Sequence, residues 1–269
     1  MIALRPALAT ILQTVDPREK AALTRSTVAE ARRGWECFDP PGDAAPWPDP
    51  AVRDRPPLRS PTEMPKRGLG SVQGRVALLH AVCHIELNAI DLAVDMAGRF
   101  GPTLAEADQR AFILDWLQVA DDEARHFVMI ADRLHELGAS YGDLPAHNGL
   151  WQAAARTHDD LMGRLVIAPM VLEARGLDVT PLMIDKLRRN RDEISADLLL
   201  VIFDEEIGHV ATGSHWFRHL CALKKIAPDE TFHAMVEAYF PGGLKRPFNE
   251  PARTKSGVPR DWYEGLAAD

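Results

Sequence analysis

Four long segments of the chain repeat apolar residues at helical spacing, and each has a glutamate in the middle of its apolar stripe. The stripe around Glu86 consists of Leu79, Val82, Cys83, Ala89, Ile90 and Ala93. The stripe around Glu173 consists of Val166, Met170 and Leu177. Residues three or four apart share one face of a helix, so these carboxylates are expected to face a helical core. A buried carboxylate needs a partner, and four in one core would repel one another unless cations lay between them.

The other two glutamates have a histidine one helical turn later. Glu123 and His126 lie among Trp116, Val119, Ala120, Phe127, Ile130 and Leu134. Glu206 and His209 lie among Leu199, Ile202, Phe203, Val210 and Phe217. Side chains three apart on a helix are neighbours, so each Glu-x-x-His pair can hold one ion. Two such pairs and one Glu from each of two further helices form the ligand set of a carboxylate-bridged two-metal bundle.

A third copy of the pattern, Glu230-x-x-His233, is interpreted as chance. Short motifs recur by accident, and the stripe of this helix instead runs through Phe232, Met235, Val236 and Tyr239. Glu230, His233 and Glu237 fall off that stripe, so we expect them to face water.

Turn signals lie about where they must be for the two ligand positions of each hairpin to be at the same level along the helices. In an antiparallel helix hairpin, residues equidistant from the turn lie at one level. The midpoint of Glu86 and Glu123 falls beside Gly101-Pro102-Thr103, and that of Glu173 and Glu206 falls at Asn190-Arg191-Asp192. The match holds to within about one helical turn.

Composition limits the class of protein. The chain has 269 residues, 46% of them apolar, which suits one large domain or a domain with an arm. A formal charge of −8 makes nucleic acid an unlikely partner. Three widely spaced cysteines indicate a reducing compartment. We see no signal peptide and no stretch apolar enough to span a bilayer, so the predicted location is the cytoplasm.

The predicted layout is all-α. Residues 1–67 form an N-terminal arm of two short helices, the second capped at Asp16-Pro17, followed by an extended segment. Nine of the twenty prolines lie in residues 38–65 of this segment, which Trp47 could pin to the bundle or which could be a solvated linker. Residues 68–240 form a four-helix bundle with a long crossover, and residues 241–269 form an irregular tail.

Local signals set the expected helix ends. Thr103 to Glu106 reads as a capping box that opens the second long helix, which Gly138 closes. Pro169 should kink the third helix, Gly176 should interrupt it, and Thr180-Pro181 should start it again. Further helices are expected over 192–224 and 228–239. No strand pattern and no phosphate-binding glycine loop is present.

The order Glu86, Glu123-x-x-His126, Glu173 and Glu206-x-x-His209 resembles the ligand order of the ferritin-like di-iron carboxylate superfamily over residues 68–224. More narrowly, the chain is similar to a bacterial ferritin-like family catalogued as a domain of unknown function. That second resemblance covers nearly the whole chain, and it rests on residues 16–20, 80–91, 121–127, 173–181 and 205–210. It implies a fold and a metal site, and no substrate.

The ligand chemistry suits iron or manganese, and the lack of thiolates argues against a structural zinc. Carboxylates with one imidazole per metal suit two Fe ions, or alternatively Mn or a mixed Fe/Mn pair. Each of Glu123 and Glu206 stacks with a ligating His and is the expected bridge. Glu86 and Glu173 are the expected terminal ligands, with His126 and His209 on one metal each. The resemblance implies that Asp122 and Glu205 bond the far nitrogen of a ligand His, although either could be an exposed helix charge.

Other candidates are weaker. His80 and His84 lie off the Glu86 face and are expected in the core or at an interface. Cys83 could line the cavity, but a buried Cys is usually only a small apolar residue. The adjacent pair His158 and Asp159 could line an entrance, and we expect them at the surface.

Three functions fit such a site. The first is an oxidoreductase that activates O2 or peroxide to oxidise or hydroxylate a small-molecule substrate, with an unknown electron donor. The second is a ferroxidase or iron-handling protein, and the third is a non-catalytic metal-binding bundle. The arm, the Pro-rich belt and the tail favour the first, as a monomer or homodimer rather than a cage.

Overall fold

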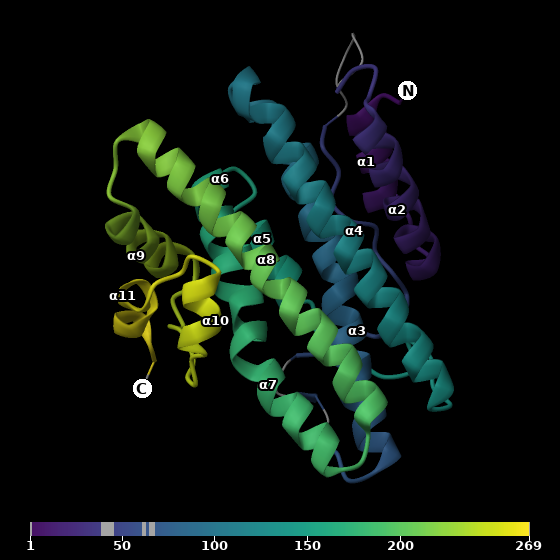
Figure 1. The fold of residues 1–269 in the computed structure, drawn as a ribbon. Coiled ribbons are helices and arrows are strands. Elements are labelled where there is room, and N and C mark those ends of the chain that lie inside the picture. The colour runs from purple at the N-terminus through teal and green to yellow at the C-terminus, as the bar shows by residue number, and fades with distance from the viewer. Residues whose placement is uncertain (1, 39–45, 61–62, 65–67, 269) are drawn as a thin grey trace. The chain divides into compact units, whose positions relative to one another are not determined.

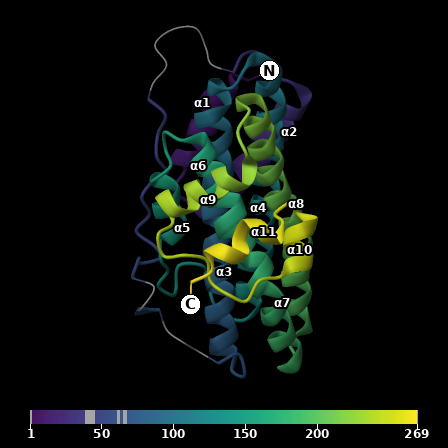
Figure 2. The ribbon, with the colours of Figure 1, turned by 90° about the vertical axis from the view of Figure 1, so that its left-hand side faces the viewer.

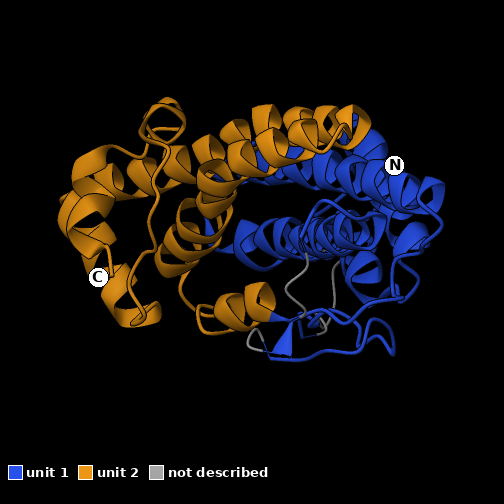
Figure 3. Cartoon of the chain, turned by 90° about the horizontal axis from the view of Figure 1, so that it is seen from below, with its two compact units in different colours: residues 1–148 blue, residues 149–269 orange. Residues whose placement is uncertain are grey.

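The computed structural model describes residues 2–38, 46–60, 63–64 and 68–268. Within those residues the secondary structure is helical, and extended pairing is limited to isolated bridges, so the all-α prediction is confirmed (Figure 1). The chain divides into two compact units, residues 1–148 and 149–269 (Figure 3). The predicted boundaries at residues 67 and 240 stay a prediction.

Unit 1 contains two short helices and one long helix hairpin. Its elements are α1 (Leu4–Gln13), α2 (Pro17–Arg33), α3 (Val72–Asp95), the π-helix η2 (Met96–Phe100), the 3-10 turn η3 (Gly101–Thr103) and α4 (Glu106–Glu136). Helices α3 and α4 pack side by side (Figure 1), and α2 packs on α4. The Asp16 carboxylate accepts a hydrogen bond from Glu19 N at 2.8 Å, so the predicted cap of α2 is confirmed.

The capping box predicted at the start of α4 is wrong. The N-cap residue is Ala105, which has no side-chain cap, and the helix begins at Glu106. Thr103 lies in the preceding 3-10 turn, where its hydroxyl donates to the Phe100 carbonyl at 2.8 Å. The hydroxyl therefore closes the hairpin turn instead of capping the helix. The other end is as expected, since Gly138 follows the helix with φ of 77°.

The described part of the Pro-rich segment is anchored at Trp47, which is the first of the two alternatives, while residues 39–45, 61–62 and 65 of that segment lie outside the described residues. The Trp47 indole N–H donates to Asp95 Oδ1 at 2.7 Å, and its ring occupies the space beside Gly98. A Cβ on Gly98 would lie 1.9 Å from that ring. Farther along, Leu58 pairs with Ala146 in an isolated bridge.

Unit 2 contains a second hairpin and a layer of short helices. Its elements are α5 (Gly149–Ala155), α6 (Leu161–Leu165), the π-helix η4 (Val166–Glu173), α7 (Ala174–Arg189), α8 (Glu193–Lys224), α9 (Pro228–Tyr239), α10 (Glu250–Lys255), α11 (Arg260–Tyr263) and η5 (Glu264–Leu266). Helices α7 and α8 pack together, and α10 contacts both (Figure 2). Asp192 caps α8 through Ser195 N at 3.2 Å.

The predicted interruptions at Gly176 and Pro181 are wrong, because α7 runs through both. A proline inside a helix leaves the carbonyl four residues earlier without its N–H partner. For Pro181 that carbonyl belongs to Leu177, and it accepts a hydrogen bond from Asn249 Nδ2 at 3.0 Å. Pro169 lies inside η4, whose wider turn accommodates the ring without ending the helical run.

The C-terminal tail is more ordered than expected. It forms α10 and α11, and it buries Val258, Trp262 and Tyr263. Arg253 is also buried and binds Asp178 of α7. The prediction of an irregular tail therefore failed, since these helices are too short to show a periodic pattern.

Among the described residues, one helical stretch meets the length and apolarity of a membrane span. It covers Val72–Thr103, with a mean hydropathy of 1.4 in its best window. The prediction that no stretch is apolar enough was therefore too strict. Of that window, 72% is buried inside the protein, which is the environment of a core helix.

The contact between α8 and η4 predicts opposite effects for two glycine substitutions. A Cβ on Gly213 would lie 2.3 Å from Pro169 Cγ, whereas a Cβ on Gly208 of the same helix would meet nothing within 4 Å. We expect Gly213→Ala to lower the free energy of unfolding by about 1–3 kcal/mol. Gly208→Ala should raise it by about 0.5–1 kcal/mol through helix propensity. Urea unfolding of both variants tests this, and equal effects would contradict the packing at Pro169.

Candidate metal centre

Three of the predicted ligands meet inside unit 1. Glu86 comes from α3, and Glu123 and His126 come from α4. His126 Nδ1 lies 3.2 Å from Glu86 Oε2 and 3.6 Å from Glu123 Oε2. All three residues are at most 3% exposed. The hairpin turn at Gly101 thus brings Glu86 and the Glu-x-x-His pair to one level, as the sequence predicted.

The helix pattern explains why these side chains face inward. Glu123 is flanked on α4 by buried Val119, Ala120, Phe127 and Ile130. The polar residues of the opposite face, Asp115, Arg125, Asp132 and Glu136, are half-buried or exposed. The burial of α4 therefore follows its amphipathic pattern. Glu123 and His126 lie on its buried apolar face, where an unpaired charge is costly.

The surroundings of this group shift the pKa values of Glu86 and His126. Burial, followed by the neighbouring Glu123 carboxylate, raises the pKa of Glu86. Burial by itself would lower the pKa of His126, but bonding and attraction to Glu123 and Glu86 raise it. Two carboxylates thus share one imidazole, in a space where burial disfavours the charged form of Glu86.

The unit 2 candidates are described separately. Glu206 and His209 lie one turn apart on α8, with His209 Nδ1 3.5 Å from Glu206 Oε1. Their side chains are 12% and 4% exposed. Among the described residues, Glu206 Oε2 is buried with no hydrogen-bond partner. Glu173 ends the π-helix η4 and is half-buried. Unit 2 thus repeats the Glu-x-x-His arrangement of unit 1 on its own long helix.

The third Glu-x-x-His copy is at the surface. Glu230 and Glu237 are exposed and His233 is half-buried, while Phe232 and Val236 face the core. The interpretation of this copy as chance is consistent with its burial, and Glu230 serves as a control position below.

The two acids that precede the Glu-x-x-His glutamates are partly exposed. Asp122 accepts hydrogen bonds from Arg125 at 3.1 Å and Gln118 at 2.9 Å, all on α4. Glu205 is half-buried on α8. Their predicted bonds to ligand histidines stay a prediction.

His80 and His84 are core residues that hold the loop after α4. Backbone N–H groups of Gly142 and Leu144 donate to His80 Nε2 at 2.9 and 3.4 Å. His84 Nδ1 bonds the Tyr141 hydroxyl at 2.8 Å, and burial lowers the pKa of His84 to about 4. Their predicted place in the core is confirmed.

Cys83 and the His158–Asp159 pair also lie as expected. Cys83 is buried, and its thiol faces the Phe127 carbonyl at 3.8 Å. His158 and Asp159 form an exposed ion pair at 2.7 Å.

A second buried face of α3 was recognised only in part from the sequence, through His80 and His84. It is a polar stripe, and its members are His80, His84, Asn88, Asp91 and Asp95. Asp91 binds Lys20 of α2 and also Arg53, the latter at 3.0 Å. Asp95 binds Trp47 and, at 2.8 Å, Arg99. The spacing of four, four, three and four residues could have revealed this stripe, but the partners come from distant parts of the sequence.

The unit 1 group fits a metal ion by its donor atoms. One atom from each of Glu86, Glu123 and His126 can be chosen so that all lie within 4.8 Å of one another. Carboxylate oxygens and an imidazole nitrogen suit iron or manganese, and a cation among them would offset the burial and the repulsion by Glu123 that raise the pKa of Glu86.

Comparison with known proteins gives a family without an assigned activity. The chain is 39% identical over 220 residues to an uncharacterized protein of Haemophilus influenzae, covering 80% of this chain and 76% of that protein. No solved structure matches it. The model of the family DUF455, described as a protein of unknown function, matches residues 13–264. The chain therefore belongs to the DUF455 family.

Proposed function

We propose that the protein is a ferritin-like two-metal oxidoreductase that uses O2 or peroxide to oxidise or hydroxylate a small molecule. The buried group of Glu86, Glu123 and His126 carries this proposal. Burying two carboxylates beside one imidazole has a large desolvation cost. If the group served packing alone, apolar residues of similar size would fill the same space without that cost.

The repeat of the pattern in unit 2 supports a pair of metals instead of one. Each unit supplies a hairpin with a glutamate on one helix and Glu-x-x-His on the next. We propose that the two hairpins complete one four-helix bundle. In such a bundle Glu86, Glu123, His126, Glu173, Glu206 and His209 would hold the two ions, with Glu123 and Glu206 as the ligands common to both.

The chain's own residues would bind the ions and keep the site dry. When bound, two ferrous ions would supply the electrons that reduce O2 or peroxide. Phe127, Ile130 and Val119 next to the α4 ligands are at most 2% exposed, so water is excluded around Glu123 and His126. The substrate and the electron donor would be small molecules or partners of the cytoplasm.

Reaction of the iron-loaded protein with O2 tests this function. The full-length protein is loaded with iron(II) without air, mixed with O2 and followed by stopped-flow absorption. We expect a transient absorption that decays without mineral and a size-exclusion mass of a monomer or homodimer. Steady mineral growth with no transient, or a cage-sized assembly, would favour the iron-handling alternative instead.

A further inference from the structure

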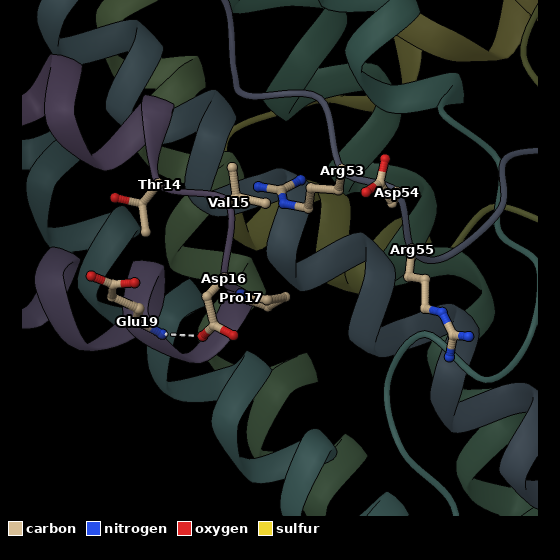
Figure 4. A pocket seen from close by; sticks show the side chains of 8 residues that line it. All are labelled: Thr14, Val15, Asp16, Pro17, Glu19, Arg53, Asp54 and Arg55. Atoms are coloured by element: carbon tan, nitrogen blue, oxygen red, sulfur yellow. Dashed lines mark hydrogen bonds between the residues drawn. The ribbon is translucent and has the colours of Figure 1, made fainter.

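An open pocket of unit 1 is lined by the start of α2 and by the extended segment that precedes α3. Its volume is about 690 Å³, and its lining residues are Thr14, Val15, Asp16, Pro17, Glu19, Arg53, Asp54 and Arg55 (Figure 4). Asp16, Pro17 and Glu19 belong to the 16–20 run that carries part of the family resemblance. Residues 16–20 do not belong to the proposed metal centre, so that centre does not account for the pocket.

The charges behind the pocket do not cancel. Lys20 is fully buried and Asp91 is 1% exposed, and the two form an ion pair. Arg53 binds the other oxygen of the same carboxylate, Asp91 Oδ2, at 3.0 Å. Two cations thus share one anion, and this group of three carries a net positive charge in a poorly solvated place.

Arg53 is the member of that group that reaches the pocket. Its side chain is 11% exposed and extends across the pocket toward Val15 (Figure 4). Within the described part of the chain, its bond to Asp91 uses Nη2, and its Nε has no partner but is buried beyond the reach of a pocket ligand. A guanidinium has five N–H donors arranged in a fork, so the N–H groups of Nη1 and the second N–H of Nη2 remain for a further acceptor.

The acids of the pocket limit the charge that a ligand can bring. The Asp16 carboxylate caps α2 through Glu19 N, so the positive helix end offsets its charge. Asp54 and Glu19 are exposed, and they repel anions only weakly through water. They disfavour a polyanion, while a single oxyanion on Arg53 would gain a charge-assisted hydrogen bond.

We propose that this pocket binds a small molecule through one oxyanion group, a carboxylate or a phosphate, that Arg53 holds. Arg53 would be the specificity-determining residue, since among the described lining residues it is the one that bonds the buried Asp91 carboxylate. Arg55, at the other end of the pocket in Figure 4, would contact the rest of the ligand. The site needs no metal, so its test is independent of the proposed oxidoreductase function.

Titration of the full-length protein with acetate and with inorganic phosphate tests the proposal. Calorimetry is run at constant ionic strength, with chloride as the balancing anion. We expect saturable binding of at least one probe, and the probe that binds identifies the group as a carboxylate or a phosphate. Arg53→Gln should weaken that binding at least about tenfold. The control Arg59→Gln, at an exposed arginine outside the pocket, should leave it unchanged.

A second variant keeps the test decisive if Arg53→Gln fails to fold, because Arg53 also holds Asp91. Asp54→Asn keeps that contact and removes one repulsive charge, so it should tighten binding by about twofold to fivefold. Circular dichroism checks the fold of each variant. The proposal is overturned if the wild-type protein binds neither probe saturably. It is also overturned if Asp54→Asn binds no more tightly than the wild type.

Discussion

Replacing Asp91 with alanine is expected to lower the free energy of unfolding by about 3–5 kcal/mol. The carboxylate is 1% exposed and is shared by Lys20 and Arg53. Without it, the Lys20 ammonium retains one described hydrogen bond, to the Leu12 carbonyl at 3.0 Å, and is buried as an uncompensated charge. The loss therefore exceeds that of an ordinary hydrogen bond.

Asp132→Ala is the matched control for this experiment. Asp132 also pairs with a basic residue of α2, Arg18, at 2.6 Å, but the two side chains are 58% and 55% exposed. An exposed pair of this kind contributes about 0–1 kcal/mol. Urea unfolding of both variants gives the comparison, and losses of similar size would show that the Lys20–Asp91 pair is not buried as described.

Arg253→Ala is the second substitution with a large expected effect, a loss of about 3–5 kcal/mol. The guanidinium donates twice to Asp178, at 2.8 and 2.7 Å, and is 2% exposed. It also packs on the rings of Phe248 and Tyr263, with centroids at 5.1 and 4.7 Å. Together with Asn249, which donates to the Leu177 carbonyl, this side chain fixes the C-terminal helices to α7, and its removal leaves Asp178 buried without its bidentate partner.

Limited proteolysis alongside urea unfolding measures that effect. We expect cleavage within residues 249–268 to become faster in Arg253→Ala, since the tail loses its anchor. Arg260→Ala is the control, because Arg260 lies in the same tail but is 57% exposed and meets Glu250 only at 3.5 Å. Equal protection of the two variants would contradict the anchoring role of Arg253.

Apolar periodicity predicted the long helices, and it predicted that Glu86 and the Glu123–His126 pair lie at the same level of the α3–α4 hairpin. Apolar stripes at helical spacing identify the core faces of α3 and α4, and the turn at Gly101 fixes which residues lie opposite. Those two facts suffice to bring Glu86 to His126. Metal binding and the joining of the two hairpins depend on more than local pattern, so they are proposals.

Features that depend on distant partners were missed. Pro181 would normally break α7, but Asn249, far along the chain, satisfies the carbonyl that the proline leaves free. The two aspartates of the polar stripe of α3 were overlooked because their ion-pair partners, such as Lys20 and Arg53, are remote in sequence. Sequence periodicity records which face is buried and carries little information on what covers a polar face.

Elemental analysis of the purified protein tests the metal centre most directly. After loading with iron(II) without air and desalting, the wild-type chain should hold about two metal ions. Glu123→Ala should lose both, because a bridging carboxylate serves both ions. Glu230→Ala, which alters an exposed Glu-x-x-His pair, should keep them. A metal-free wild type, or full metal content in a folded Glu123→Ala variant, would contradict the account.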